Sequence, residues 1–159
     1  MARKSATAKP RWRAKLEKET PVKVEPIAPK MQRQWGTGTI VIPRALDVDE
    51  LVRAVRKGKL TTIGRIRKQL GKKYGADTAC PLCTGIFLRI VAETAEEDRV
   101  AGAKRITPYW RVVRDDGSMI EKFPGGAPAH AAKLKAEGHD FEPGRKLRVA
   151  GIRVKPAKD

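Results

Sequence analysis

The sequence predicts a mainly α-helical domain with one short β-hairpin, arranged as a winged helix-turn-helix and flanked by basic extensions. Three helix signals follow one another between Leu46 and Gly102. After them the apolar period changes to alternation, and Asp116-Gly117 marks a tight turn between two short runs. Three helices followed by a hairpin are typical of a winged helix-turn-helix, whose last helix lies in a nucleic-acid groove.

Charge divides the 159 residues into three parts. Residues 1–35 carry ten Lys and Arg against three Glu, and residues 143–159 carry six against one Asp. The middle, residues 36–142, holds nineteen bases and fourteen acids and contributes only +5 of the net charge of +17. Because charge and proline dominate the first part, it offers little apolar surface to offset the entropy lost on ordering. We therefore expect a basic, disordered arm over 1–35, a folded domain over 36–142 and a basic tail over 143–159.

The surplus of positive charge favours an anionic partner, and nucleic acid fits best because neutralised phosphates release counterions. An acidic protein surface or a membrane surface is the alternative. No run of about 18 apolar residues predicts a spanning helix, and the first residues lack the apolar centre of a secretory signal. With only two cysteines, no disulfide framework is expected, and we predict a reducing, cytoplasmic location at the nucleoid.

The first two helices have recognisable starts. Asp47 is the expected N-cap of a helix that Gly58 closes. Thr61 or Thr62 is the expected N-cap of the next helix. The residues expected to face the core recur at spacings of three and four: Val48, Leu51, Val52, Val55, Ile63, Ile66 and Leu70.

The third helix is expected to begin near Pro81, which suits a first helical turn, and to end at Gly102. Its second half contains the acidic run AETAEED, so we expect that half to lie away from any nucleic acid. The face predicted to be buried consists of Leu82, Ile86, Ile90 and Phe87.

Past the third helix, residues 109–113 and 118–120 are expected to pair as the hairpin. Residues 127–139 then return to a helical pattern, with Ala131 and Leu134 facing inward. Residues 146–154 are expected either to add a basic strand pair or to continue the tail.

Cys80 and Cys83 form a Cys-x-x-Cys pair at the start of the third helix. A structural zinc needs four ligands, and the remaining soft donors, His130 and His139, lie far along the chain. The pair also lacks the βαβ context of a redox motif. We therefore favour packing at the helix start over a metal, redox or nucleophilic role, and we predict no metal and no cofactor. For both histidines we expect a surface or capping role.

Several segments, taken in order, resemble one known family. They are KLTTIGRIRKQLG, ACPLCTGIFLRI, TPYWRVVRDDGSMIEKFPGG and LKAEG. Together they are similar to the DNA-binding, active-site domain of the alkylguanine-DNA alkyltransferases, which are methylated-DNA–protein-cysteine methyltransferases, and of their non-catalytic alkyltransferase-like relatives. The resemblance runs from about Leu46 to His139. It implies the winged helix-turn-helix of the alkyltransferase C-terminal domain.

The chain departs from that family at the reactive strand. Family enzymes carry Pro-Cys-His-Arg-Val where this chain carries Pro108-Tyr109-Trp110-Arg111-Val112. By the resemblance, Tyr109 stands at the position of the alkyl-accepting cysteine and Trp110 at that of the histidine beside it. A phenol with a pKa near 10 and no adjacent base is a poor nucleophile at neutral pH. We therefore predict no catalytic residue, as in the alkyltransferase-like branch that lacks the cysteine.

Two further departures concern nucleotide flipping. The family's Thr-Tyr-Gly is Thr62-Ile63-Gly64 here, and the family arginine that fills the vacated base stack falls near Leu82. An apolar side chain can also wedge between bases. The resemblance still implies a DNA-binding surface and a pocket. The expected DNA-binding residues are Thr62, Arg65, Lys68, Leu82, Thr84, Gly85 and Arg89, and the expected pocket residues are Tyr109, Trp110 and Phe123. These aromatic residues either stack a base or fill a core.

The leading hypothesis is a monomeric, non-catalytic protein that binds duplex DNA and recognises damaged or alkylated sites for repair, together with a repair-protein partner. One alternative is a methylated-DNA–protein-cysteine methyltransferase that uses a displaced thiol, Cys80 or Cys83. Another is an RNA- or protein-binding adaptor on the same scaffold, since a fold does not fix a function.

Overall fold

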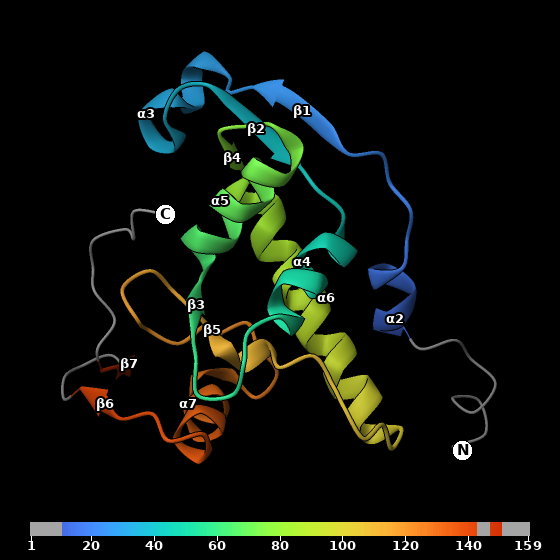
Figure 1. The fold of residues 1–159 in the computed structure, drawn as a ribbon, viewed down its shortest axis with the longest axis vertical. Helices are drawn as coiled ribbons and strands as arrows, with labels where there is room; N and C mark the ends of the chain where they lie inside the picture. Colours follow the sequence, from blue (N-terminus) through green and yellow to red (C-terminus); the bar gives the residue numbers. More distant parts are fainter. Residues whose placement is uncertain (1–10, 143–146, 151–159) are drawn as a thin grey trace.

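The computed structural model describes residues 11–142 and 147–150. Helices dominate it, and three small sheets of two or three strands join them (Figure 1). This mainly helical architecture with short strands confirms the predicted fold class. None of the helices in the part of the chain that the structure describes is long and apolar enough to cross a membrane.

A helix-turn-helix forms the centre of the molecule. Helix α4 (Ala45–Arg53) is followed by α5 (Ile63–Tyr74) and by the 20-residue α6 (Pro81–Val100), which passes through the middle of the molecule (Figure 1). Thr62 caps α5 as expected, because its Oγ1 accepts the N–H of Arg65 at 3.2 Å. Pro81 occupies the first turn of α6, also as expected.

The predicted N-cap of α4 is wrong. Arg44 is the N-cap, and Asp47 lies three residues inside the helix, where its Oδ2 accepts the N–H of Arg44 at 3.0 Å. The same buried carboxylate accepts hydrogen bonds from Tyr74 Oη at 2.7 Å and Lys73 Nζ at 3.1 Å. Asp47 therefore joins α4 to the end of α5, a tertiary role that capping rules do not reveal. The helix ends at Arg53, before Gly58.

The amino-terminal part of the chain is more ordered than its composition indicates. Residues 11–35 form α2 (Arg11–Leu16), β1 (Lys23–Pro26), the 3₁₀ helix η1 (Pro29–Met31) and α3 (Gln32–Trp35). Leu16 and Ile27 are both buried. The predicted disorder is therefore wrong for residues 11–35. Although charged residues and prolines dominate this segment, Leu16 and Ile27 bury their side chains in the folded protein and so hold it in place. Residues 1–10 lie outside the described part.

Three short strands fasten this segment to the helix-turn-helix. Strand β2 (Thr39–Ile42) pairs antiparallel with β1 and parallel with β4 (Thr78–Ala79). Because β4 leads directly into α6, the sheet fixes the point at which that helix begins. A second pair joins β3 (Thr61–Thr62) in parallel to β5 (Val112–Val113).

The predicted hairpin is correct in its turn and wrong in its pairing. Residues Tyr109–Arg111 form the 3₁₀ helix η2 instead of a strand, and β5 pairs with β3. The turn itself is present: the N–H of Gly117 donates to the carbonyl of Arg114 at 2.8 Å. The carbonyl of Ser118 accepts the N–H of Arg114 at 3.0 Å, which closes the turn, and Ser118 also forms an isolated bridge to Arg148. Before the turn, Val112 and Val113 therefore pair with Thr61 and Thr62 and not with the residues that follow the turn.

The carboxyl-terminal part packs beneath η2. Helix α7 (Gly126–Ala136) buries Ala131 and Leu134, as expected. Strand β6 (Phe141–Glu142) pairs antiparallel with β7 (Arg148–Val149). Of the predicted tail, the structure therefore places residues 147–150 beside the domain, and Val149 is buried against α7.

The buried face of α6 differs from the predicted one. Leu82 and Ile86 are exposed, at 66% and 52%, whereas Ile90 and Phe87 are partly buried. The core-facing stripe is shifted around the helix and contains small and polar side chains, which let α2 and α4 pack closely. Its members are Thr84, Leu88, Val91, Ala92, Thr94 and Ala95.

Candidate nucleic-acid interface

The outer face of the first half of α6 carries apolar side chains in an open position. Leu82 and Ile86 lie one turn apart on it, with Gly85 and Arg89 beside them, and all four are exposed. A Cβ added at Gly85 meets nothing within 4 Å. Thr84 does not belong to this face: it is fully buried, and its Oγ1 donates to the carbonyl of Cys80 at 2.8 Å. Thr84 is therefore a helix-start residue and not an available contact.

A pocket of about 400 Å³ opens beside this face. Its floor is apolar, and one wall comes from α2, a segment outside the family resemblance. The floor is made by Ile63, Leu88, Ile90, Ile120 and Phe123, and the wall by Trp12 and Lys15.

The rim of this pocket is positively charged. Lys15, Arg89, Arg114 and Lys122 line it, and no Asp or Glu does. Of these four, Arg89 has a loose ion pair with Glu93, at 3.8 Å. An apolar floor with cations around it suits a ligand that combines a flat apolar body with negative charge, as a nucleotide does.

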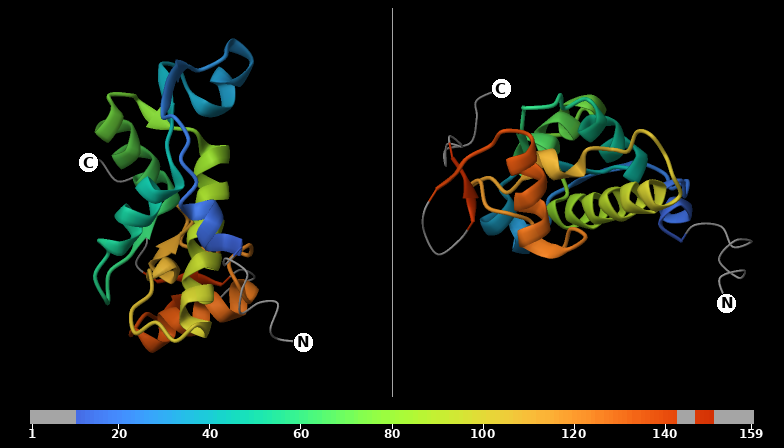
Figure 2. Two further views of the ribbon diagram at one scale, coloured as in Figure 1. Left: turned by 90° about the vertical axis from the view of Figure 1, so that its right-hand side faces the viewer. Right: turned by 90° about the horizontal axis from the view of Figure 1, so that it is seen from below.

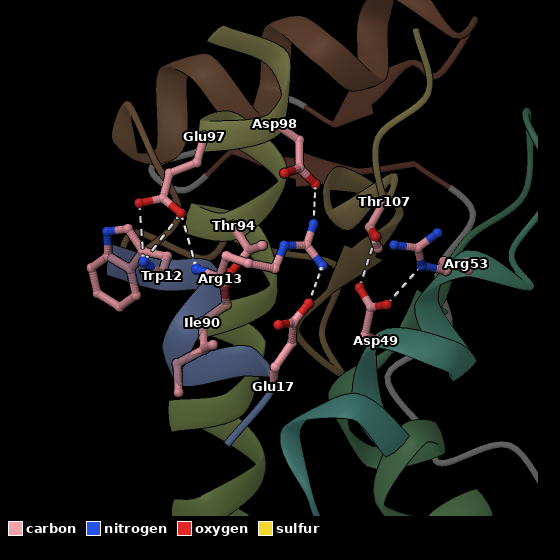
Figure 3. A network of polar contacts seen from close by, with 10 residues as sticks. All are labelled: Trp12, Arg13, Glu17, Asp49, Arg53, Ile90, Thr94, Glu97, Asp98 and Thr107. Carbon is pink, nitrogen blue, oxygen red and sulfur yellow. Dashed lines mark hydrogen bonds and ion pairs between the residues drawn. The ribbon is translucent and has the colours of Figure 1, made fainter. Parts of the chain in front are cut away.

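Carboxylates on α6 hold the Trp12 wall in place (Figure 3). The Glu97 carboxylate accepts the backbone N–H groups of Trp12, at 3.0 and 3.1 Å, and of Arg13, at 3.0 Å. It therefore caps α2 from a neighbouring helix. The Arg13 guanidinium binds Asp98 and lies 3.5 Å from Glu17.

Trp12 itself is surrounded by cations. The Lys15 ammonium lies 4.6 Å from the centre of its ring, and the guanidinium groups of Arg11 and Arg89 lie at 5.1 and 5.5 Å. Such contacts are each worth about 0.5–1 kcal/mol at exposed sites. They place an aromatic face and positive charge together at the pocket mouth.

Tyr109 is part of the core. Its side chain is 1% exposed, and its hydroxyl donates to Oε2 of Glu96 at 2.7 Å. The ring packs edge-on against Trp110 and Phe123, each at a centroid distance of 5.2 Å. Burial and the Glu96 carboxylate both raise the pKa of Tyr109 above its ordinary value. Of the three aromatic residues expected to form a pocket, only Phe123 lines the one described above.

His130 has a structural role that the sequence did not reveal. It is 1% exposed, Nδ1 accepts the N–H of Ile120 at 3.1 Å, and Nε2 lies 2.8 Å from the carbonyl oxygen of Trp110. The Nε2–H tautomer satisfies both contacts. Burial lowers the pKa of His130 to about 4. The surface or capping role is therefore wrong, and His130 joins the segment that contains Trp110 to the one that contains Ile120.

A partly buried ion pair supports the same region. Arg111 donates from Nη2 and Nε to the Glu137 carboxylate, at 2.8 and 3.0 Å, and from Nη1 to the carbonyl of Val55 at 2.7 Å. Thr107 Oγ1 donates to Asp49 at 2.7 Å on the approach to η2. These contacts hold both ends of the segment that contains Tyr109 and Trp110 against α4, the residues that follow α4, and the end of α7.

The two cysteines lie at the start of α6. Cys80 is buried, and its Sγ accepts the N–H of Cys83 at 3.5 Å. Burial and the neighbouring Cys80 thiol raise the pKa of Cys83 to about 11, so thiolate is scarce at neutral pH. Within residues 11–142 and 147–150, no group of three or more His, Cys, Asp and Glu side chains is placed to hold a metal ion.

Arg65 and Lys68 line a second groove on α5, which has a volume of about 760 Å³. It shares no lining residue with the pocket on α6. The expected DNA-binding residues are thus divided: Leu82, Gly85 and Arg89 lie at the pocket, Arg65 and Lys68 lie in the α5 groove, and Thr62 caps α5.

Comparison with known proteins gives one similar solved structure. No family model and no curated protein matches the sequence. The fold is similar to that of S. pombe Atl1, whose structure was solved in complex with damaged DNA containing O6-carboxymethylguanine. The two chains are 15% identical, and the match covers 70% of this chain and 94% of that chain with a TM-score of 0.48.

Proposed function

We propose that the protein binds duplex DNA through the outer face of α6 and its adjoining pocket, recognises damaged or distorted sites, and transfers no alkyl group. The pocket is the observation that carries this proposal. It combines an apolar floor, an aromatic wall and four cations without a carboxylate, and it lies beside α6, which follows α5 in the helix-turn-helix.

The features of the site divide the work of recognition. Lys15, Arg89, Arg114 and Lys122 line the pocket. In this proposal they contact phosphates, which supplies affinity without sequence information. The exposed Leu82 can wedge between bases, and Trp12 or the edge of Phe123 can contact a base that has left the stack. Stacking on an aromatic side chain is worth about 1–3 kcal/mol.

A preference for damaged sites follows from the cost of unstacking. That cost is lowest for a mismatched or damaged base, so a pocket that receives an unstacked base favours such sites. The volume of about 400 Å³ lies within the usual range of small-molecule pockets.

The absence of alkyl transfer is proposed from the chemistry of three side chains. Tyr109 is buried with a raised pKa, and its hydroxyl donates a hydrogen bond to Glu96. Cys80 is buried as the N-cap of α6, and the Cys83 thiol is held protonated by a pKa of about 11. None of them is an activated nucleophile.

A salt titration of duplex binding tests the first half of the proposal. We expect the logarithm of the binding constant to fall steeply with that of the salt concentration, by about 0.9 per phosphate contacted. Arg89→Gln with Lys122→Gln should lower the affinity, whereas the matched pair Arg56→Gln with Lys57→Gln, on exposed loop positions, should change it much less. Binding that ignores salt, or equal losses in both pairs, contradicts the proposed face.

Competition and mass measurement test the second half. Duplexes with an O6-alkylguanine or an unpaired base should compete better than undamaged duplex or structured RNA. Incubation with O6-alkylguanine DNA should leave the protein mass unchanged. A gain of one alkyl group on Cys80 or Cys83 shows that the protein is a transferase after all.

A further inference from the structure

Helix α5 carries five basic residues and no acidic one. Two of them serve the fold: Arg67 Nε donates to the carbonyl of Ala79 at 3.0 Å, and Lys73 pairs with Asp47 at 3.1 Å. The other three are Arg65, Lys68 and Lys72. They are exposed, and among the described residues none of the three forms an ion pair with an acidic side chain.

These three cations lie in one groove. With spacings of three and four they share the face of α5 opposite the fully buried Ile66 and Leu70. The groove contains one carboxylate, Asp77, which is already engaged because its Oδ2 accepts the N–H of Thr39 at 2.8 Å.

The length of the cationic row suits a DNA strand. From Arg65 to Lys72 it extends about 10 Å along the helix at 1.5 Å per residue. That corresponds to about three phosphates of one strand at 3.4 Å each along the duplex axis. The ligand that best matches this row of cations is therefore the phosphodiester backbone of one DNA strand.

The groove on α5 is separate from the pocket on α6. The two share no lining residue, and both views of Figure 2 place α5 and α6 in different layers of the molecule. Each helix turns its buried stripe toward the core: α5 buries Ile66 and Leu70, and α6 buries Leu88 and Val91. Arg65, Lys68 and Lys72 are therefore not among the residues that line the pocket proposed for the first duplex.

We propose that the groove on α5 binds the backbone of a second DNA segment, so that one protein molecule bridges two duplexes. This rests on the proposed binding of a first duplex at α6. It adds a function, the joining of DNA segments, which a single interface does not supply.

A capture experiment tests bridging directly. An immobilised duplex is loaded with protein, and retention of a free, labelled duplex is measured; single-duplex affinity is measured separately by gel shift. The test variant carries Arg65→Gln, Lys68→Gln and Lys72→Gln. The control carries Arg56→Gln, Lys57→Gln and Lys59→Gln, with the same charge change at three exposed positions outside both grooves.

Bridging predicts that the α5 variant retains at least tenfold less free duplex than the control while their single-duplex affinities stay within about threefold. The salt dependence of the capture step should weaken by about 2.7 in slope for three lost phosphate contacts. Unchanged capture overturns the inference. So does an equal loss of capture and single-duplex binding, or a loss accompanied by a change in molecular mass on sedimentation. If the wild-type protein binds no single duplex, the proposed function itself fails, which is a different result.

Discussion

The hydroxyl of Tyr109 donates a 2.7 Å hydrogen bond to Oε2 of Glu96 and thereby ties η2 to α6. Glu96 also accepts from Arg99 at 2.7 Å and lies 3.7 Å from Lys133. Burial alone raises the pKa of Glu96, but the hydrogen bond from Tyr109 and the nearby cations outweigh it and lower that pKa. Tyr109 is thus a hydrogen-bond donor in a structural network between η2 and α6.

Replacing Tyr109 by Phe should lower the free energy of unfolding by about 1–2 kcal/mol, since the variant keeps the packed ring and loses a hydrogen bond to a charged group. Duplex binding should stay within about twofold of the wild-type value, because Tyr109 does not line the pocket. Urea unfolding and gel shift measure the two effects. A Tyr109→Phe variant that is as stable as the wild-type protein but no longer binds duplex DNA would contradict the structural role of Tyr109.

The lowered pKa of His130 predicts that the protein loses stability in mild acid. Its pKa is about 4 in the folded protein and about 6.5 in the unfolded chain, so the unfolded chain takes up the proton first. The associated stability is present above pH 6.5 and is lost as the pH falls toward 4, by about 3 kcal/mol in total. Unfolding free energies measured from pH 7.5 to 4 should show this slope.

His130→Gln provides the control for that slope. Glutamine retains polar atoms for the Ile120 and Trp110 contacts but does not titrate. We expect the variant to be less stable at pH 7.5 and to show a flatter profile down to pH 4. If the unfolding free energy of the variant falls with pH as steeply as that of the wild-type protein, a group other than His130 causes the acid sensitivity.

Local rules account for the parts of this fold that local chemistry decides. Thr62 and Pro81 start helices as predicted, and Ile66, Leu70, Ala131 and Leu134 are buried as their spacing indicates. In each case a cap or a periodic apolar stripe contains the information, so no distant partner is needed.

The wrong predictions concern residues whose environment comes from elsewhere in the chain. The spacing of Leu82 and Ile86 predicts a buried stripe on α6. In the structure α2 and α4 pack against a different face of α6, so Leu82 and Ile86 are exposed. Leu16 and Ile27 lie among charges and prolines, and only the folded domain gives them a place to bury. The pocket wall at Trp12 depends on Glu97, 85 residues away, a contact that no local pattern signals.

Asp47→Asn should destabilise the protein by about 2 kcal/mol at pH 7, since hydrogen bonds to a charged group are the stronger ones. Burial alone raises the pKa of Asp47, but hydrogen bonds from Arg44, Tyr74 and Lys73 outweigh it and hold that pKa well below the usual range. The stability contributed by this carboxylate is therefore present above about pH 4 and is lost as the pH falls below that value. Unfolding measured between pH 4 and 2 should be flatter in the variant, in a window distinct from that of His130.

Glu97→Ala should release α2 without unfolding the domain. The variant loses the acceptor for the N–H groups of Trp12 and Arg13, at a cost of about 1 kcal/mol as for other helix caps. Hydrogen exchange at these two amides should accelerate, and duplex affinity should fall because the pocket loses its wall. Glu121→Ala, at an exposed position, is the control. Equal exchange in both variants contradicts the capping contact.

Replacement by alanine should have opposite effects on stability at two glycines, Gly85 of α6 and Gly71 of α5. Gly85 lies on the open face of α6, where an added Cβ meets nothing within 4 Å. Gly85→Ala should therefore stabilise the fold by about 1 kcal/mol through helix propensity. Gly71 on α5 is the opposite case, since its Cβ would lie 2.8 Å from Thr78 Cα and 2.9 Å from the carbonyl oxygen of Ala76. Gly71→Ala should destabilise by about 1–3 kcal/mol, as thermal unfolding will show.

The larger substitution Gly85→Leu turns the same position into a test of the proposed interface. Leucine is also a better helix former than glycine, so the fold should be at least as stable as wild type. DNA that lies against α6 must approach Gly85 closely, and the added side chain should then lower duplex affinity about tenfold or more, equivalent to 1.4 kcal/mol. Leu46→Ala, at an exposed position on α4 away from the pocket, should leave binding unchanged. If the Gly85→Leu protein is stable and binds duplex DNA with wild-type affinity, the DNA does not bind to this face of α6.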